Sequence, residues 1–163
     1  MIKDTNNLPK IIDNLQQFNR TDVRAGVLEG GKMQMIAHVQ EYGATITAKN
    51  AGGYLMIPMP DGSFRKLKQV TIPARPFIQM TVINHQQEWK NEAAETFNRI
   101  IRGNSIGDFK VGLAKKMKLD IQNTMRSGNF TANAPLTVER KGGSQPLIDT
   151  GGLLNSIQGK VDA

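Results

Sequence analysis

Histidine and cysteine, the side chains that most often act as catalytic bases, nucleophiles or metal ligands, are scarce in this sequence. The chain has two histidines, His38 and His85, and no cysteine. A nucleophilic triad needs a base that a third group orients, and neither histidine has a serine or an aspartate at a suggestive spacing. The lack of cysteine removes thiolate nucleophiles, disulfides and cysteine-based zinc sites. We therefore expect no catalytic residues, no cofactor and no enzyme activity.

The acidic and glycine-rich segments do not form a ligand-binding motif either. Glu88, Glu92 and Glu95 are spaced as on the solvated face of a helix, which is not the pattern of metal ligands. The Gly-Gly pairs lack the lysine pattern of a phosphate-binding loop. We expect no metal site.

Basic side chains give a second interpretation, a nucleic-acid-binding module. The chain carries 21 basic and 14 acidic residues, a net charge of +7, which is also ordinary for a soluble domain of this length. Phe64 and Phe109 are the aromatic residues beside the basic clusters, whereas base-stacking modules normally have more. The clusters comprise Arg65, Lys66, Lys68 and Arg75, and further along Arg99, Arg102, Lys110, Lys115, Lys116 and Lys118.

Hydrophobic residues at spacings of three and four predict the helices of the chain. Asp4 or Thr5 is the expected cap of the first helix, and Ser105 with Asp108 resembles a capping box before the last. The predicted helices span residues 5–19, 32–42, 77–102 and 106–126. In the third helix the expected buried stripe consists of Val82, Gln86, Trp89, Ala93, Phe97 and Ile100.

Alternating side chains and turn residues predict the extended segments. The longest is a β-hairpin over 44–72, with its turn at Pro60-Asp61-Gly62-Ser63. It is too long for one small core to cover, so we expect it to project as an arm. Shorter strands are predicted at 23–28, 136–138 and 158–161, with a helical turn over 153–157. Together these elements indicate one α+β domain over 1–163, a small antiparallel sheet packed by helices, with a loop-rich C-terminal segment at 127–163.

Two prolines make a stiff corner between the arm and the helix that follows. Pro73 and Pro76 fix φ near −65°, and Arg75 between them presents a planar fork of donors suited to a carboxylate on its own or a neighbouring chain. Near the C-terminus, Asp149 or Thr150 is expected to cap the turn that begins at Gly151. An ordinary local folding role remains the alternative for both segments.

The sequence contains two sets of motifs with a long helical pair between them: His38–Ala44 with Ile72–Ile78, and Pro135–Thr137 with Arg140-Lys141 and Pro146–Ile157. In this order they resemble the tail-completion and neck proteins of tailed bacteriophages. These include the virion-morphogenesis family of Mu-like phages and the related head–tail joining family of HK97-like phages. The first family motif is usually a tighter histidine-glutamate-tyrosine-glycine, whereas Val39 and Gln40 separate His38 from Glu41 here.

The resemblance implies a structural virion protein that forms a ring at the head–tail junction, commonly six-fold, with each arm lying on the neighbouring subunit. Its implied partners are further copies of itself, a connector or portal-side protein, and the tail tube or terminator protein. DNA passes through the ring, so non-specific contact with it is possible, and assembly occurs in the host cytoplasm without a membrane. A tail-terminator ring is the alternative junction role. The candidate subunit-contact residues are Arg65, Lys66, Lys68, Pro73, Arg75, Pro76, Phe77, Asp149, Thr150 and Gly151.

Overall fold

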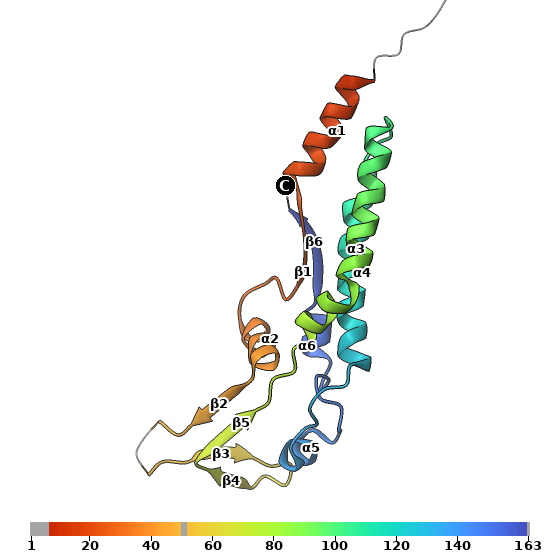
Figure 1. Cartoon of the computed structure of the whole chain (residues 1–163). Coiled ribbons are helices and arrows are strands. Elements are labelled where there is room, and N and C mark those ends of the chain that lie inside the picture. Colours follow the sequence, from red (N-terminus) through yellow and green to blue (C-terminus); the bar gives the residue numbers. More distant parts are fainter. Residues whose placement is uncertain (1–6, 50–51, 163) are drawn as a thin grey trace, which may run out of the picture.

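The computed structural model describes residues 7–49 and 52–162. Helices and two-stranded antiparallel sheets make up the chain, which confirms the predicted α+β class. The molecule is elongated, with helices α3 and α4 along its length and the strands β2 to β5 at one end (Figure 1). The helices are α1 (Leu8–Arg20), α2 (Lys32–Tyr42), α3 (Phe77–Ile101), α4 (Phe109–Ser127), α5 (Pro135–Lys141) and α6 (Gly152–Asn155). The strands are β1 (Asp22–Gly26), β2 (Ala44–Thr47), β3 (Leu55–Pro58), β4 (Phe64–Leu67), β5 (Gln69–Ile72) and β6 (Gln158–Asp162).

Strands β1 and β6 pair near the middle of the molecule and pack against α4. The register sets Val23 opposite Val161. Gly159 allows the close approach to the helix, because a Cβ there would lie 2.1 Å from the carbonyl oxygen of Ala114. The segments before α2 and after α6 are thereby joined on one face of the helical pair.

The core lies where α3 begins, α4 ends and the C-terminal segment returns. It is apolar, and its members come from three stretches far apart in the sequence. Burial of large aliphatic and aromatic side chains contributes about 1.5–3 kcal/mol each, so this cluster is the main source of stability. Its buried members are Phe77, Ile121, Met125, Leu147, Leu153 and Ile157.

The buried face of α3 differs from the predicted stripe. Thr81 and Thr96 are buried at 0% and 1% exposure, whereas Val82 and Phe97 are 41% exposed. The Thr81 hydroxyl donates to the carbonyl of Phe77 at 2.7 Å, so the threonine can be buried without an unsatisfied polar group. The predicted stripe was therefore right at Ile100, which is fully buried, and wrong at Val82 and Phe97, and α3 leaves apolar side chains on its outer face.

Helix α1 is amphipathic but has no buried residue. Its Phe18 stacks against Phe109 at 6.1 Å and meets Phe97 edge-on at 6.2 Å. The buried ammonium of Lys110 donates to the carbonyls of Phe18 and Thr21, close to the C-terminal end of α1. The described helix begins at Leu8, and the expected caps Asp4 and Thr5 lie outside the described residues.

Residues 44–72, here called the arm, form the predicted hairpin in two paired sections. Strand β2 pairs with β5 near the base, and β3 pairs with β4 near the turn. Gly62 adopts φ 79° in the turn, and the Asp61 carboxylate accepts hydrogen bonds from the backbone N–H and hydroxyl of Ser63. The arm lies beside α5 at one end of the molecule (Figure 1).

Two local predictions were wrong. The stretch at 136–138 belongs to helix α5 and is not a strand, because Pro135 occupies the first helical turn and Gly142 ends it at φ 67°. The expected capping box also fails: the Ser105 hydroxyl accepts from the N–H of Gly107, and Asp108 makes no cap hydrogen bond. Within 7–49 and 52–162, no helix is long and apolar enough to span a membrane.

Candidate functional site

The two stretches of the first motif meet at the base of the arm, around the buried guanidinium of Arg75. This side chain is 4% exposed. Its Nη1 donates to Oε1 of Gln40 at 2.8 Å, and its backbone N–H donates to the Gln40 carbonyl. Its Nε and Nη2 donate to the carbonyls of Thr131 and Ala132 and to Oδ1 of Asn133, at 2.8 to 3.2 Å. One arginine thus joins α2, the arm and the segment before α5.

The neutral character of these acceptors corrects the sequence expectation for Arg75. We expected a carboxylate partner on this chain or a neighbouring one, but the fork is filled by carbonyl and amide oxygens of the same chain. Desolvation lowers the pKa of the Arg75 guanidinium. Phe77 is fully buried in the core. Arg75 therefore holds the base of the arm through contacts within the chain, whereas Phe77 belongs to the core.

Glu41 caps the N-terminus of α3 from the last turn of α2. Its Oε2 accepts from the N–H of Ile78 and its Oε1 from the N–H of Gln79, both at 2.9 Å. The N-cap residue itself, Pro76, supplies no side-chain cap. A carboxylate at this end also interacts favourably with the helix dipole. This role was not predicted from the sequence, although Glu41 belongs to the first motif, His38–Ala44.

Gly43 lets the chain turn tightly between α2 and β2. Its φ is 75°, and a Cβ at this position would lie 2.9 Å from both the backbone N of Ala74 and the carbonyl oxygen of Ile72. Only glycine combines this dihedral with such a close approach. Arg75, Glu41 and Gly43 together form a stiff support, called the arm base below.

The arm presents basic and apolar side chains to solvent. Arg65, Lys66 and Lys68 are all exposed, as the sequence suggested. Neither lysine forms an ion pair with any residue in the described part of the chain. The large apolar side chains that the arm leaves exposed, between 46% and 59%, are Ile46, Tyr54, Met56 and Phe64.

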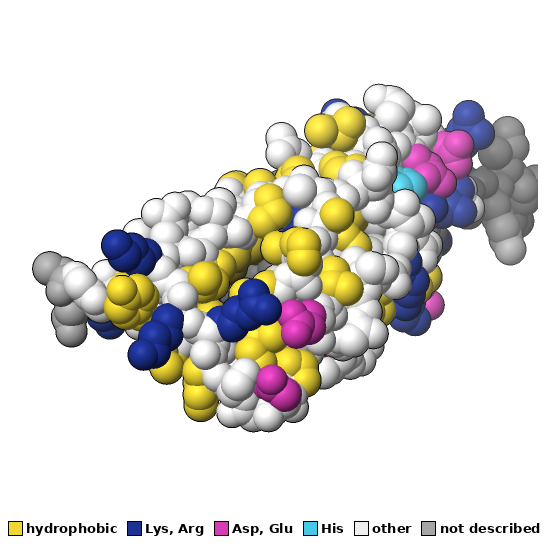
Figure 2. Space-filling model, turned by 90° about the horizontal axis from the view of Figure 1, so that it is seen from below, with side chains coloured by type: hydrophobic (Ala, Val, Ile, Leu, Met, Phe, Trp, Pro, Cys, Tyr) yellow, Lys and Arg dark blue, Asp and Glu magenta, His cyan; other side chains and the backbone are white. Residues whose placement is uncertain are grey.

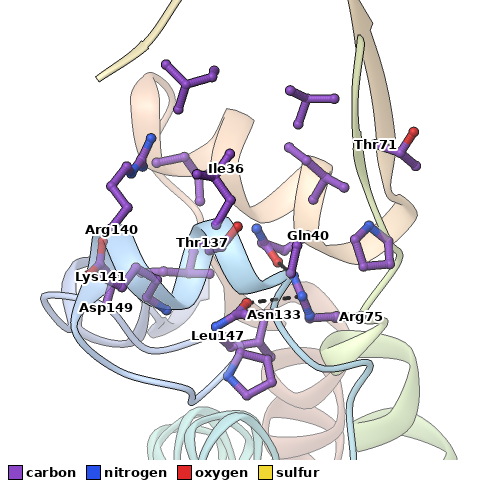
Figure 3. A pocket seen from close by; sticks show the side chains of 18 of the residues that line it. Ile36, Gln40, Thr71, Arg75, Asn133, Thr137, Arg140, Lys141, Leu147 and Asp149 are labelled. Atoms are coloured by element: carbon purple, nitrogen blue, oxygen red, sulfur yellow. Dashed lines mark hydrogen bonds between the residues drawn. The ribbon is translucent and has the colours of Figure 1, made fainter. Parts of the chain in front are cut away.

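A groove of about 690 Å³ separates the inner face of the arm from the body of the molecule. Figure 2 shows the molecule from the end that carries the arm, where hydrophobic side chains are interspersed with Lys and Arg. In Figure 3, Gln40, Arg75 and Asn133 lie at one side of the groove, whereas Arg140, Lys141 and Asp149 lie at the other. The apolar lining residues are Met33, Ile36, Ile57, Leu67, Val70, Ile72, Pro73, Leu136, Pro146, Leu147 and Leu153.

The second motif borders this groove. Asp149 and Thr150 line it with exposed side chains. Gly151 precedes α6 at φ 79°, and no side chain caps that helix, so the expected cap by Asp149 or Thr150 is wrong. The predicted packing beneath the turn is confirmed, since Leu153 and Ile157 are buried in the core. Pro73 and Pro76 are half-buried at the arm base.

The two histidines lie on different helices, His38 on α2 and His85 on α3. His38 is exposed and contacts the ring of Tyr42, with centroids 4.8 Å apart. His85 stacks on Trp89, and its Nδ1 is 3.6 Å from Glu88 and 3.9 Å from Asp120. Among the described residues no three His, Cys, Asp or Glu side chains come together as they would around a metal ion.

The carboxylate cluster on α3 takes part in pairing between helices. Glu88 accepts from the ammonium of Lys116 at 2.9 Å, which lowers the pKa of Glu88 and raises that of Lys116. Asp120 accepts from the indole N–H of Trp89 at 2.9 Å. These contacts connect α3 to α4.

Comparison of the sequence and structure with protein-family models, curated proteins and solved structures found no match.

Proposed function

We propose that this chain is a structural subunit of a tailed-phage virion, forming a closed ring at the head–tail junction that joins the tail to the DNA-filled head. The observation that carries the proposal is a preformed, exposed arm on a rigid base. Because the arm base is fixed by buried hydrogen bonds, the arm is presented ready to contact a neighbour, and little ordering entropy is lost on assembly.

The exposed area of the chain supports a need for partners. The chain exposes 11029 Å², whereas a compact monomer of this size exposes about 8000 Å². The nine residues outside the described ranges add at most about 1400 Å² as extended chain. The excess of about 1600 Å² equals two contact faces of about 800 Å² each, which is what each subunit of a ring buries.

A ring of identical subunits requires two different and complementary faces on each copy. The arm supplies a basic and apolar face. One side of α3 supplies exposed apolar side chains, Val82, Ile83 and Ile101. Burial of these side chains against the exposed apolar residues of the arm, Met56 and Phe64, favours docking of the arm of one copy on α3 of the next. We expect six-fold symmetry, as the family resemblance implies.

The alternative of a nucleic-acid-binding module loses support from the helical basic cluster. Lys110 is buried against backbone carbonyls, and Lys116 is paired with Glu88. Neither ammonium is free to neutralise a phosphate, so the cluster offers fewer contacts than the sequence suggested.

Negative-stain images of virions that carry a label on this chain test the proposal. We expect the label at the neck, and label at the tail tip or on the shell would contradict it. In a second experiment, the double substitution Met56→Glu with Phe64→Glu places charges on two exposed residues of the arm. We expect this variant to leave heads and tails unjoined. Leu119→Glu, an equally exposed apolar residue on α4, is the matched control and should give joined particles.

A further inference from the structure

The groove between the arm and the body is an apolar cleft, and the exposed arm residues Met56 and Phe64 do not line it. One wall is the inner face of the arm, and the other is formed by α2 and α5. Ile57, Val70 and Ile36, from opposite walls, are only partly buried, so the chain does not fill the space itself. A volume of about 690 Å³ lies within the range of pockets that bind ligands.

The groove carries an uncompensated positive charge. Its lining includes the four cations Lys32, Arg75, Arg140 and Lys141, and Asp149 is its one carboxylate. None of the four forms an ion pair within residues 7–49 and 52–162.

The hydrogen bonds of Arg75 and Lys141 go to neutral groups. Lys141 donates to the carbonyls of Gln145 and Ile148 at 3.0 and 2.7 Å, and Arg75 also has neutral acceptors. Desolvation lowers the pKa of Lys141, although Asp149 acts in the opposite direction. A concave site with low-dielectric walls and unpaired cations focuses a positive potential on its opening.

We propose that this groove binds a peptide segment of another protein in which large apolar side chains alternate with Asp and Glu. The apolar residues pack between the arm and α5, and the carboxylates meet Arg140 and Lys141 at the rim. Charge decides against a second copy of the arm, since Arg65, Lys66 and Lys68 are themselves basic. The apolar walls decide against DNA, whose phosphates gain nothing from them. The proposal does not depend on ring formation.

A peptide selection tests this inference. Short random peptides are displayed on yeast and sorted for binding to the full-length protein. We expect enriched peptides to combine Asp or Glu with Leu, Ile or Phe. Enrichment of basic or purely polar peptides, or no enrichment at all, would overturn the proposal.

The enriched peptides are then titrated against variants by fluorescence anisotropy. Arg140→Glu reverses an exposed charge at the rim and should weaken binding about tenfold or more. Lys115→Glu, an exposed charge on α4 outside the groove, is the control and should leave affinity unchanged. Circular dichroism confirms that each variant is folded. Equal loss in both variants, or displacement of the peptide by duplex DNA, would contradict a groove specific for acidic peptides.

Discussion

Replacement of Glu41 by glutamine isolates the contribution of the carboxylate at the arm base. The carboxylate accepts one hydrogen bond from each of Ile78 and Gln79. Gln keeps the size but has one oxygen, so one N–H loses its acceptor. Loss of a cap costs about 0.5–2 kcal/mol, and loss of a charge at a partly buried helix terminus costs up to about 2 kcal/mol. We expect Glu41→Gln to lower the free energy of unfolding by about 2–3 kcal/mol.

Urea unfolding followed by the fluorescence of the single tryptophan, Trp89, measures this change. With a slope near 2 kcal/mol per molar urea, the midpoint should fall by about 1 M. Glu95→Gln on the exposed side of the same helix is the control and should change stability by less than about 0.5 kcal/mol. If both variants unfold at the wild-type midpoint, the Glu41 cap does not stabilise α3 and the reasoning is refuted.

Three further substitutions probe other contacts. Gly43→Ala forces a side chain into positive φ and to 2.9 Å from the backbone of Ala74, so the thermal midpoint should fall by the equivalent of about 1–3 kcal/mol; Gly143→Ala, where the space is open, should leave it unchanged. Lys110 has a lowered pKa through desolvation, so this side chain binds fewer protons in the folded than in the unfolded chain as pH approaches 10.5, and its own contribution to stability should rise with pH there. Lys110→Met removes this contribution, so across this pH range the urea midpoint of the variant should rise less with pH than that of the unsubstituted chain. Equal slopes of urea midpoint against pH in the two chains would contradict the prediction. Trp89→Phe removes the hydrogen bond to Asp120 and should lower the free energy of unfolding, measured by circular dichroism, by about 1.5 kcal/mol. The loss in the double variant with Asp120→Asn should be smaller than the sum of the two single losses.

The helices and the hairpin were predictable because their signals are local. Periodic hydrophobic residues placed α1 to α4, and Pro60 to Ser63 placed the turn of the arm. The failure at 136–138 has the same origin, since Thr137 and Val138 favour strands locally, whereas Pro135 and Gly142 at the two ends define a helix. In this stretch the proline and the glycine at the two ends carried more information than β propensity.

The buried side of α3 could not be chosen from the sequence, because hydrophobic residues lie on more than one face. Val82, Ile83 and Phe97 are more apolar than Thr81 and Thr96, yet the threonines are buried. The main core contacts come from the C-terminal segment and α4, and their positions are set by tertiary packing. Val82 and Ile83, left outside, are among the residues that we assign to the subunit contact.

The arm base was visible in the sequence as a pair of motifs but not as a set of contacts. Arg75 was singled out, yet its acceptors at 131–133 lie in a segment without periodicity, more than fifty residues away. Glu41 satisfies N–H groups of α3 that no local capping rule connects to it. Long-range hydrogen bonds of this kind follow from the fold and cannot be read from spacing.

A density map of the assembled virion tests the central claim most directly. The account predicts this chain as a closed ring between head and tail, with the arm of each copy, residues 44–72, lying against α3 of the next. A map that has other proteins forming every ring of the junction, or copies of this chain whose arms touch no neighbour, would contradict it.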